Sequence, residues 1–463
     1  MASGFDSPFK LDYTAAMLKL KLLLVVALLI VALTACEAPT PPPSPTPWPT
    51  ATLEATGTPA AAVEVATASR RVEPSPTPTA ILATLSVWEN LPPAQAEQLA
   101  QDIEQFQAQF PQYQVELRHY NSPEEFLKGV SGQTVDFDIV LAAPPLLGSL
   151  WAMERLAPLA DFFPPSFLGA FEAVTLAGAE QEGQLWGLPD TTGFHLLLFY
   201  NRDLVDNPPG DTEGLARLPE ALAGQAAGLG LNSYDPIWLL PWLSAYGGWL
   251  TDEAGAPTLD SEAMVAALTL YLDWQQPQTP LAPVTTYHEM QANFLNGNLA
   301  TIIDGEWAIR ELAGTNRLSW SVAPLPRLSQ SGESAQPPAP LLLGRYWAIS
   351  ADVVSGDQVL AITAFLDSMT RSERQLAWTA QFGLLPTRRE ALDAPLIISD
   401  PILRASMLQM KAGRPVLLGV NVNLLLDAMR APLREALAGT LTPAEAAAAM
   451  QANAEALLLN SGQ

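Results

Sequence analysis

The stretch "ILATLSVWEN", Ile81–Asn90, decides the fold class, because it reads as a buried strand that opens an alternation of strands and helices. Apolar residues at helical spacing follow over Ala94–Phe110, and "YQVELRHY", Tyr113–Tyr120, is predicted as a second strand. A helix near Glu124–Val130 leads to the apolar strand "FDIVLAA", Phe137–Ala143. This order predicts an α/β fold with a parallel sheet that is covered by helices.

The same patterns continue to the end of the chain. Further helices are predicted over Ser261–Trp274, Thr286–Leu295, Gln358–Met369, Ser372–Gln381 and Pro443–Leu458. Further strands are predicted over Leu196–Tyr200, Ala300–Ile303 and Arg345–Ser350. Roughly 380 residues of globular composition exceed what one core holds, so two lobes are expected.

The N-terminal part has the features of an export signal. Leu22–Leu33 is an apolar run of twelve residues preceded by Lys19 and Lys21. The run is shorter than the roughly 20 residues of a membrane-spanning helix, and it fits the apolar region of a signal peptide. We expect residues 1–35 to be this signal, with Met17 as an alternative start.

The only cysteine, Cys36, follows directly in the sequence Leu33-Thr34-Ala35-Cys36. This ending resembles the bacterial lipobox, in which the cysteine is lipidated and becomes the mature N-terminus. Cys36 is therefore predicted to be a lipid anchor, and an ordinary secretory signal with an unmodified cysteine is the alternative. Residues 37–80 hold eleven prolines and nine threonines, so 36–80 is predicted as a disordered, semi-rigid tether.

Composition limits the partners and the chemistry. The net charge of −25 disfavours nucleic acid as a partner. With a single cysteine and with His119, His195 and His288 scattered along the chain, neither an internal disulfide nor a metal site is expected, and no cofactor is predicted. Hydrolase motifs and phosphate-binding glycine loops are also absent from the sequence, so a binding protein is favoured over an enzyme.

Several longer stretches occur in an order that is known from one family. They are "LSVWEN", "FDIVLAAPPLLGSLWAMERLAPLADFF", "GQLWGLPDTTGFHLLLFYNRDLV", "PWLSAYGGWL", "FLNGNLATIIDGEWAI" and "AFLDSMTRSERQLAWTAQFGLLPTRREAL". Over nearly all of residues 83–460 the chain resembles the bacterial extracellular solute-binding proteins of carbohydrate ABC importers, the group that includes maltose-binding protein. The resemblance implies a type II periplasmic-binding-protein fold, with two α/β lobes joined by crossing strands and a ligand cleft between them.

The resemblance also implies lobe boundaries. The chain would leave the first lobe around Gly193–His195, return near Pro324–Pro326 and cross again near Ser368–Arg371. The N-terminal lobe would then combine residues 82–194 and 326–369, and the C-terminal lobe residues 195–325 and 370–463. The implied function is capture of a sugar, as an oligosaccharide or glycoside, and its delivery to a membrane permease by a monomeric lipoprotein on the outer face of the cell membrane or in the periplasm.

Sugar recognition requires aromatic platforms together with polar side chains that form paired hydrogen bonds. The candidate ligand residues, taken from the ends of strands and from the family's cleft positions, are Trp88, Glu89, Asp190, Asp235, Trp238, Trp242, Trp307 and Arg345. Among these, Trp307 in "IIDGEWAI" matches the family's stacking tryptophan. Core positions are the competing interpretation for every aromatic residue, and Trp151, Trp274 and Trp378 are expected to be core.

The same fold could instead bind a polyamine, an iron chelate or a phosphorylated polyol, and one other role stays open. Acidic and aromatic residues also suit a polyamine through charge and cation–π contacts. A phosphorylated ligand is disfavoured by the few basic residues at the candidate positions. A sensory subunit that passes its closed state to a signalling receptor would have the same sequence features as a transport receptor.

Overall fold

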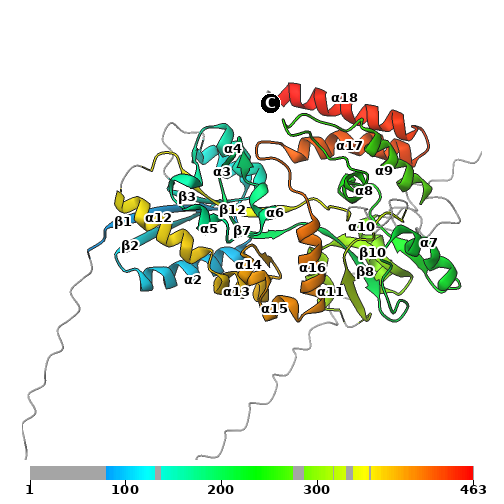
Figure 1. The fold of residues 1–463 in the computed structure, drawn as a ribbon, viewed down its shortest axis with the longest axis horizontal. Helices are drawn as coiled ribbons and strands as arrows, with labels where there is room; N and C mark the ends of the chain where they lie inside the picture. The colour runs from blue at the N-terminus through cyan, green and yellow to red at the C-terminus, as the bar shows by residue number, and fades with distance from the viewer. Residues whose placement is uncertain are drawn as a thin grey trace, which may run out of the picture. The chain divides into compact units, whose positions relative to one another are not determined.

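The computed structural model describes residues 80–130, 137–274, 286–315, 317–329, 337–353 and 356–461. The predicted export signal, Cys36 and residues 36–79 of the tether lie outside these ranges. Within them, no helix is both long enough and apolar enough to cross a bilayer. The described chain contains two main sheets, each packed between helices, and we refer to each sheet with its helices as the first and the second lobe (Figure 1).

The first lobe is built on a seven-stranded sheet with the order β13-β7-β12-β3-β1-β2, in which β4 joins β12. Its strands are β1 Ala83–Glu89, β2 Tyr113–His119, β3 Ile139–Ala142, β4 Leu156–Ala157, β7 Leu188–Gly193, β12 Leu343–Ser350 and β13 Leu385–Pro386. β1 pairs in parallel with β2 and with β3, which confirms the predicted parallel sheet for these strands. β12 is antiparallel to β3 and β7, so the complete sheet is mixed.

Alternating side chains of this sheet enter two cores. Val87 of β1 packs with Phe106 and Phe365 on one face, whereas the next residue, Trp88, packs with Phe126 on the other. The helices of this lobe are α2 Pro93–Gln109, α3 Pro123–Val130, α4 Pro144–Ala152, α5 Pro165–Leu168, α6 Ala173–Ala177, α12 Gly356–Met369, α13 Ser372–Phe382, α14 Arg389–Leu392 and α15 Pro395–Ile398. A short hairpin of β5 Glu180–Gln181 and β6 Gln184–Leu185 follows α6.

Helix α2 illustrates how the sequence forms these elements. Pro93 occupies its first turn, where the missing N–H is not needed. Leu99, Ile103 and Phe106 lie at helical spacing and are buried. The apolar periodicity of the sequence therefore identifies the face of α2 that packs on the sheet.

The second lobe is built on a four-stranded sheet with the order β11-β8-β10-β9. Its strands are β8 Leu196–Asn201, β9 Ala227–Gly230, β10 Leu299–Gly305 and β11 Trp320–Ala323. The helices are α7 Thr212–Ala221, α8 Leu240–Ala245, α9 Glu262–Asp273, α10 Tyr287–Leu295, α11 Trp307–Ala313, α17 Val422–Leu437 and α18 Pro443–Ser461. One core lies under α8, α9, α17 and α18, and a second lies under α10 and α11.

The two lobes are connected first by the crossing from β7 to β8. Phe194 lies at this crossing with a left-handed backbone (φ 60°), and His195 follows it in a fully buried position. β7 belongs to the first sheet and β8 to the second, so the chain passes from one sheet to the other at Phe194 and His195.

Packing favours later positions than the sequence predicts for the two other crossings. Leu325, Leu328 and Leu341 pack in the second-lobe core, so the chain returns to the first sheet only at Leu343, where β12 begins. Trp378 packs in the first-lobe core, which places α13 in the first lobe rather than in the second. The lobe limits at residues 326 and 370 are therefore both earlier than the contacts favour.

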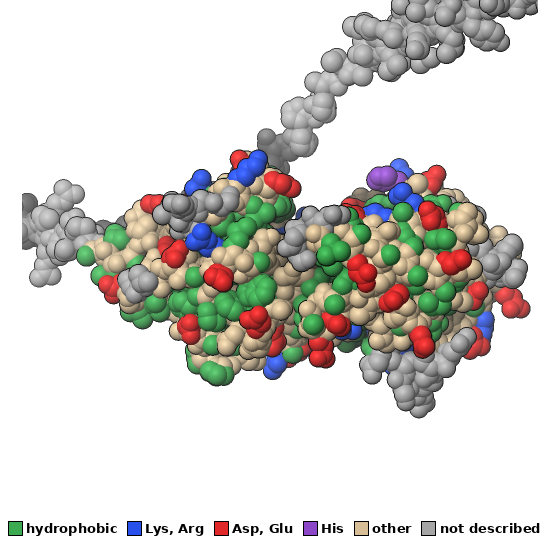
Figure 2. Space-filling model, turned by 90° about the horizontal axis from the view of Figure 1, so that it is seen from above, with side chains coloured by type: hydrophobic (Ala, Val, Ile, Leu, Met, Phe, Trp, Pro, Cys, Tyr) green, Lys and Arg blue, Asp and Glu red, His purple; other side chains and the backbone are tan. Residues whose placement is uncertain are grey.

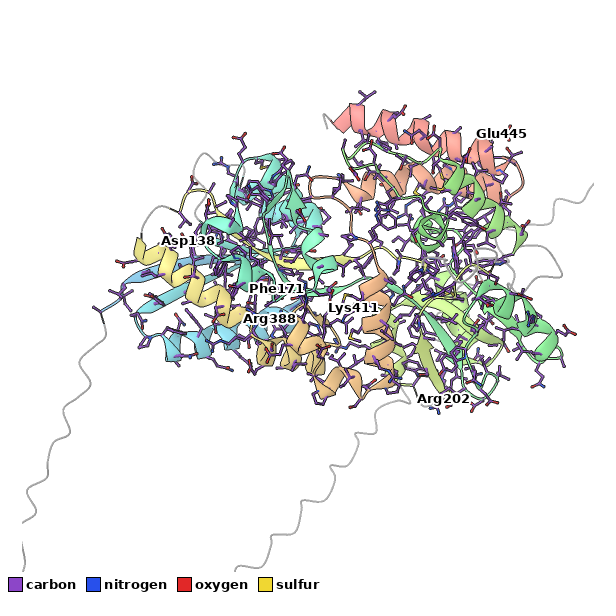
Figure 3. All side chains as sticks on the ribbon, in the orientation of Figure 1. Asp138, Phe171, Arg202, Arg388, Lys411 and Glu445 are labelled. Carbon is purple, nitrogen blue, oxygen red and sulfur yellow. The ribbon has the colours of Figure 1, made fainter. Side chains whose placement is uncertain are left out.

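Helix α16, Pro401–Ala412, lies between the two sheets (Figure 1). Its Ala405 packs in a second-lobe core. Met407 and Met410 pack instead with Leu385 of the first-sheet strand β13 and with Leu392 of α14. Lys411 at its end faces Glu172 at 3.5 Å. Close by, Arg388 lies over the ring of Phe171, with 4.7 Å between the guanidinium carbon and the ring centroid (Figure 3).

Candidate functional site

Three predicted ligand residues come together at the end of the first sheet that is nearest the crossing to β8. Glu89 ends β1. Asp190 and Arg345 belong to β7 and β12, which pair with each other in the same sheet. Burial lowers the pKa of the Arg345 guanidinium, and the nearby carboxylates of Asp190 and Glu89 act in the opposite direction. The structure thus brings three of the predicted ligand residues together in one charged cluster.

Hydrogen bonds within the protein occupy most of this cluster. The Glu89 carboxylate accepts hydrogen bonds from the Leu91 N–H at 2.6 Å and is 2.8 Å from Nδ1 of His119. Asp190 Oδ1 accepts hydrogen bonds from Trp347 Nε1 at 3.0 Å and from a guanidinium N–H of Arg374 at 2.7 Å. Both carboxylates are fully buried, so they organise the end of the sheet in this conformation.

Arg374 is the member of the cluster that sequence reasoning missed. Its guanidinium forms ion pairs at 2.7 Å with both Asp102 and Asp190, and it lies 4.5 Å from the ring centre of Trp378. In the sequence it stands in the polar stretch "SERQ" at the start of a predicted helix, where an arginine normally faces solvent. No pattern in the sequence distinguishes it from such a residue.

Trp88 is a core residue and does not present a free ring. Only 2% of its surface is exposed, and its ring lies within 5.2–5.7 Å of those of Tyr120, Phe126 and Phe137. The Arg118 guanidinium lies over the same ring at 4.9 Å. The structure therefore disagrees with its prediction as a ligand platform, because both faces of the indole are covered by protein.

The second lobe contributes an aromatic cluster around Trp307, the first residue of α11. Its indole Nε1 donates a hydrogen bond to the Tyr287 hydroxyl at 2.8 Å. Its ring centre lies 5.1 Å from that of Phe194 at the lobe crossing and 6.4 Å from that of Trp238. Trp307 is half-buried, so it is the one predicted aromatic residue of this lobe with exposed surface beside the crossing.

Trp238, Trp242 and Asp235 serve the structure of the second lobe. Trp238 is 4% exposed and donates from Nε1 to the Ile303 carbonyl at 2.6 Å. Trp242 is fully buried against Trp274, with ring centres 4.8 Å apart. Asp235 caps a short helix by accepting from the Ile237 N–H at 3.2 Å. The two tryptophans are core residues in this conformation, contrary to their prediction as ligand platforms, and Asp235 retains a partly exposed carboxylate.

Two acidic residues of the stretch "DGEW" escaped prediction. Burial raises the pKa of Asp304 to about 7, although hydrogen bonds from the Gly305 N–H and the Gln291 amide oppose the shift. Burial likewise raises the pKa of Glu306 to about 7, and backbone N–H groups of Phe194 and Trp307 oppose it. Glu306 Oε2 is buried and accepts no hydrogen bond in the described structure. No pattern in the sequence indicates that these side chains turn inward at the lobe crossing.

The raised pKa of Glu306 predicts how stability depends on pH. The folded protein holds this proton up to about pH 7, whereas the unfolded chain releases it near pH 4.5. The free energy of unfolding should therefore fall as pH rises through this window. Glu306→Gln removes this dependence, so its stability relative to wild type should increase by about 2–3 kcal/mol between pH 5 and pH 8.

Urea unfolding of both proteins at several pH values measures this difference. Burial also lowers the pKa of His195 to about 4, but that group is present in both proteins and cancels in the comparison. Glu435→Gln, at an exposed position, is the control and should give a difference that does not vary with pH. A Glu306→Gln difference that is constant from pH 5 to pH 8 would contradict the assignment.

Gly305 positions the Trp307 indole, which yields a second prediction. A Cβ atom at residue 305 would lie 2.2 Å from the ring carbons of Trp307, so the ring occupies the space that a side chain would need. Gly305→Ala should push the ring off Tyr287 and lower the free energy of unfolding by about 1–3 kcal/mol. Urea unfolding, with the wavelength of tryptophan emission as second readout, checks both effects. Gly314→Ala, where a Cβ meets nothing, should change neither.

A cavity of about 420 Å³ has walls from both lobes. The first lobe contributes Trp151 and Gln181, and the second contributes residues 254–257, Leu425 and Leu458. Residues 417–421, from the segment that runs between the lobes, complete the wall. We call it the interlobe cavity. Trp151 was expected to be core; it packs against the first-lobe core but is only half-buried, and it also forms part of this wall. Trp274 and Trp378 are core residues, as expected.

Residues 416–419, beside the interlobe cavity, contact both lobes. Val416 packs in a second-lobe core, whereas Leu418 inserts into the first-lobe core around Leu147. A Cβ atom on Gly148 of α4 would lie 2.9 Å from the backbone nitrogen of Gly419. The two lobes are therefore in backbone contact at this edge of the cavity.

The described residues contain no group of three or more His, Cys, Asp or Glu side chains that could hold a metal ion.

A family model with the description "Bacterial extracellular solute-binding protein" matches residues 101–405. The chain belongs to this family. Its two α/β lobes with a cavity between them have the arrangement in which ligand pockets commonly occur, since such pockets lie preferentially where two compact units meet.

Two characterised proteins have related sequences. This solute-binding protein is 21% identical to the maltotriose-binding protein of Pyrococcus abyssi over 323 residues, which cover 68% of this chain and 69% of that protein. It is 26% identical to the maltodextrin-binding protein MdxE of Bacillus subtilis over 227 residues, which cover 46% of this chain and 52% of that protein.

Solved structures have the same fold. A cyclo/maltodextrin-binding protein complexed with maltotetraose aligns with a TM-score of 0.69 at 19% identity, over 83% of this chain and 99% of that one. The GacH receptor of Streptomyces glaucescens, solved with acarbose, aligns with a TM-score of 0.64 at 23% identity, over 82% of this chain and 99% of that one. The MalE domain of Bdellovibrio bacteriovorus, bound to maltotriose, aligns with a TM-score of 0.62 at 22% identity, over 81% of this chain and 100% of that one. These similarities establish the type II periplasmic-binding-protein fold.

Proposed function

We propose that this solute-binding protein captures an oligosaccharide of the maltodextrin class in the interlobe cavity and delivers it to the permease of an ABC importer. The observation that carries the proposal is the wall of the cavity, in which Trp151 and Gln181 of the first lobe lie with residues 254–257 of the second and residues 417–421 between them. An indole stacks on the C–H face of a sugar ring, and the amides of Gln181 and Asn421 can bind its hydroxyl groups. The names of the related proteins support the ligand class.

Binding in such a cavity couples the ligand to the position of the lobes. A sugar that contacts both walls stabilises the closed arrangement over any open one, so its binding shifts the population of the two states. The permease then recognises the closed receptor. The protein performs no chemical step on the sugar.

The N-terminal residues indicate where the protein is located in the cell. We propose that the receptor is exported, that Cys36 is acylated, and that the proline- and threonine-rich residues 37–80 hold the lobes away from the outer face of the cell membrane. Asp and Glu side chains are spread over both halves of the face shown in Figure 2, whereas Lys and Arg occur at fewer places. Such a surface favours attachment through a lipid over attachment to anionic headgroups.

Thermal unfolding with a panel of ligands tests the proposal. Maltose, maltotriose, maltotetraose, unrelated sugars, spermidine and putrescine are each added to the purified protein. A ligand at 100 times its dissociation constant should stabilise the protein by about 2.7 kcal/mol, which raises the midpoint measurably. We expect the shift with maltodextrins. A shift with the polyamines alone would change the assigned ligand class to polyamines. The absence of a shift with any sugar would refute the proposal that the protein binds an oligosaccharide.

A further inference from the structure

A second cavity adjoins the interlobe cavity on the first lobe. It has a volume of about 510 Å³ and is lined by Trp151, Ala152, Glu154, Leu156, Glu182 and Trp186. We call it the outer cavity. None of its lining residues is among those predicted from the sequence to bind the ligand.

The two cavities share structural elements. Trp151 forms part of the wall of both. The β5–β6 hairpin supplies Gln181 to the interlobe cavity, and its turn residue Glu182 lines the outer one. A ligand that extends past Trp151 out of the interlobe cavity therefore meets the outer cavity next.

The walls of the outer cavity carry two fixed aromatic rings. The rings of Trp151 and Trp186 meet edge to face, with centroids 6.5 Å apart and planes at 66°. Trp186 Nε1 donates a hydrogen bond to the Gln181 carbonyl at 3.1 Å, which fixes the orientation of this indole. Both rings are only half-buried. Such rings can cover the apolar face of a sugar without a large loss of side-chain entropy on binding.

Two carboxylates lie beside the rings. Glu154 and Glu182 both have a left-handed backbone, with φ of 56° and 54°. Throughout the residue ranges given above, neither side chain forms an ion pair with a basic residue. Their oxygens are therefore available to accept hydrogen bonds from a ligand.

We propose that the outer cavity binds a further sugar unit of the same oligosaccharide, stacked on Trp186 and hydrogen-bonded through its hydroxyl groups to Glu154 and Glu182. The inference rests on the proposed function, because it extends the ligand from the interlobe cavity. The combination of flat rings with carboxylate acceptors suits a pyranose, which has C–H faces and hydroxyl edges. Binding of a further sugar unit in the outer cavity makes the receptor selective for the length of the oligosaccharide.

Calorimetric titration of the wild type and of Trp186→Ala with maltose, maltotriose, maltotetraose and maltopentaose tests this inference. In the wild type, affinity should increase with the number of units until the outer cavity is filled. In Trp186→Ala, the longest sugars should lose roughly five- to tenfold in affinity, whereas maltose should be unaffected. Trp320→Ala is the matched control, since this half-buried tryptophan lies on the edge strand β11 and lines neither cavity.

Glu182→Gln is a second variant that keeps the shape of the side chain, and it should reduce affinity for the long sugars by a smaller factor. Losses that are equal for every sugar length, or absent from both variants, would overturn the outer cavity as a sugar site while leaving the proposed function intact. A wild type that binds none of these sugars would refute the proposed function as well. Spermidine binding that depends on Trp186 would show that the outer cavity takes an ammonium ligand instead.

Discussion

Replacing Arg374 with Met should lower the free energy of unfolding by about 3–5 kcal/mol. Arg374 forms ion pairs at 2.7 Å with both Asp102 and Asp190, and little of any of the three side chains is exposed. Its removal would leave Asp102 and Asp190 buried without their ion-pair partner. The hydrogen bonds from Trp378 and Trp347 that remain are neutral, and Arg345 acts on Asp190 only as a nearby charge. Such a loss is a large fraction of the stability of a typical domain.

Urea unfolding at pH 7 measures this effect. Arg371→Met is the matched control, because Arg371 is exposed and pairs with Asp367 at 3.5 Å. The control should lose less than about 1 kcal/mol, as exposed ion pairs do. Adding Asp190→Asn to Arg374→Met should recover part of the stability by removing one of the uncompensated charges. If the free energy of unfolding falls no more in Arg374→Met than in Arg371→Met, the buried network does not stabilise the end of the first sheet.

Gly148→Val should reduce affinity for the sugar at least roughly tenfold, a loss of about 1.4 kcal/mol in binding free energy. The α4 helix approaches Gly419 so closely that a Cβ on residue 148 would lie 2.9 Å from the backbone nitrogen and 3.1 Å from the Cα of Gly419. Gly419 cannot easily yield, since its left-handed backbone (φ 90°) suits glycine. The side chain would therefore separate the two walls of the interlobe cavity.

Calorimetric titration gives the affinity, and small-angle X-ray scattering reports whether the sugar still compacts the protein. Gly210→Val is the control, because a Cβ at residue 210 meets nothing within 4 Å. Thermal unfolding without ligand shows whether the variant retains its fold. Unchanged affinity in a folded Gly148→Val protein would mean that the contact between α4 and Gly419 plays no part in ligand binding.

The sequence predicted most of the fold because local patterns and packing agree there. The apolar spacing of Leu99, Ile103 and Phe106 identified α2, and the alternation of strands and helices identified the parallel strands β1, β2 and β3. The direction of β12 could not be predicted in the same way. Its pairing with β3 and β7 joins segments about 150 to 200 residues apart, and no local pattern in the sequence records that choice.

The candidate site was harder to predict, because residue type does not determine whether a side chain is covered. Glu89, Asp190 and Arg345 were each predicted as ligand residues, and the structure places them together at one end of the first sheet, where strand ends in such folds meet. Trp88 stands beside Glu89 but points to the opposite face, and there Phe126 and Phe137 cover it. The alternation of side chains along β1 thus separates a charged residue of the cluster from a core residue.

Trp151 shows the reverse case. It lies at the end of an apolar helix, where core was the reasonable expectation, yet it is half-buried at the edge between the lobes. Its environment depends on Gly419 and on the neighbouring residues 417–421, which follow more than 260 residues later. Only the packing of the two lobes reveals that Trp151 lines a cavity.

The most direct test of the account is calorimetric titration of the purified protein with maltotriose, run in parallel on Trp151→Ala. Wild type should bind one maltotriose per chain with saturating heat, and the sugar should be recovered unchanged. Trp151→Ala should bind at least roughly tenfold more weakly, since it loses the ring shared by both cavities. No heat from wild type with any maltodextrin, or full affinity in the folded Trp151→Ala variant, would contradict the interlobe cavity as a sugar site.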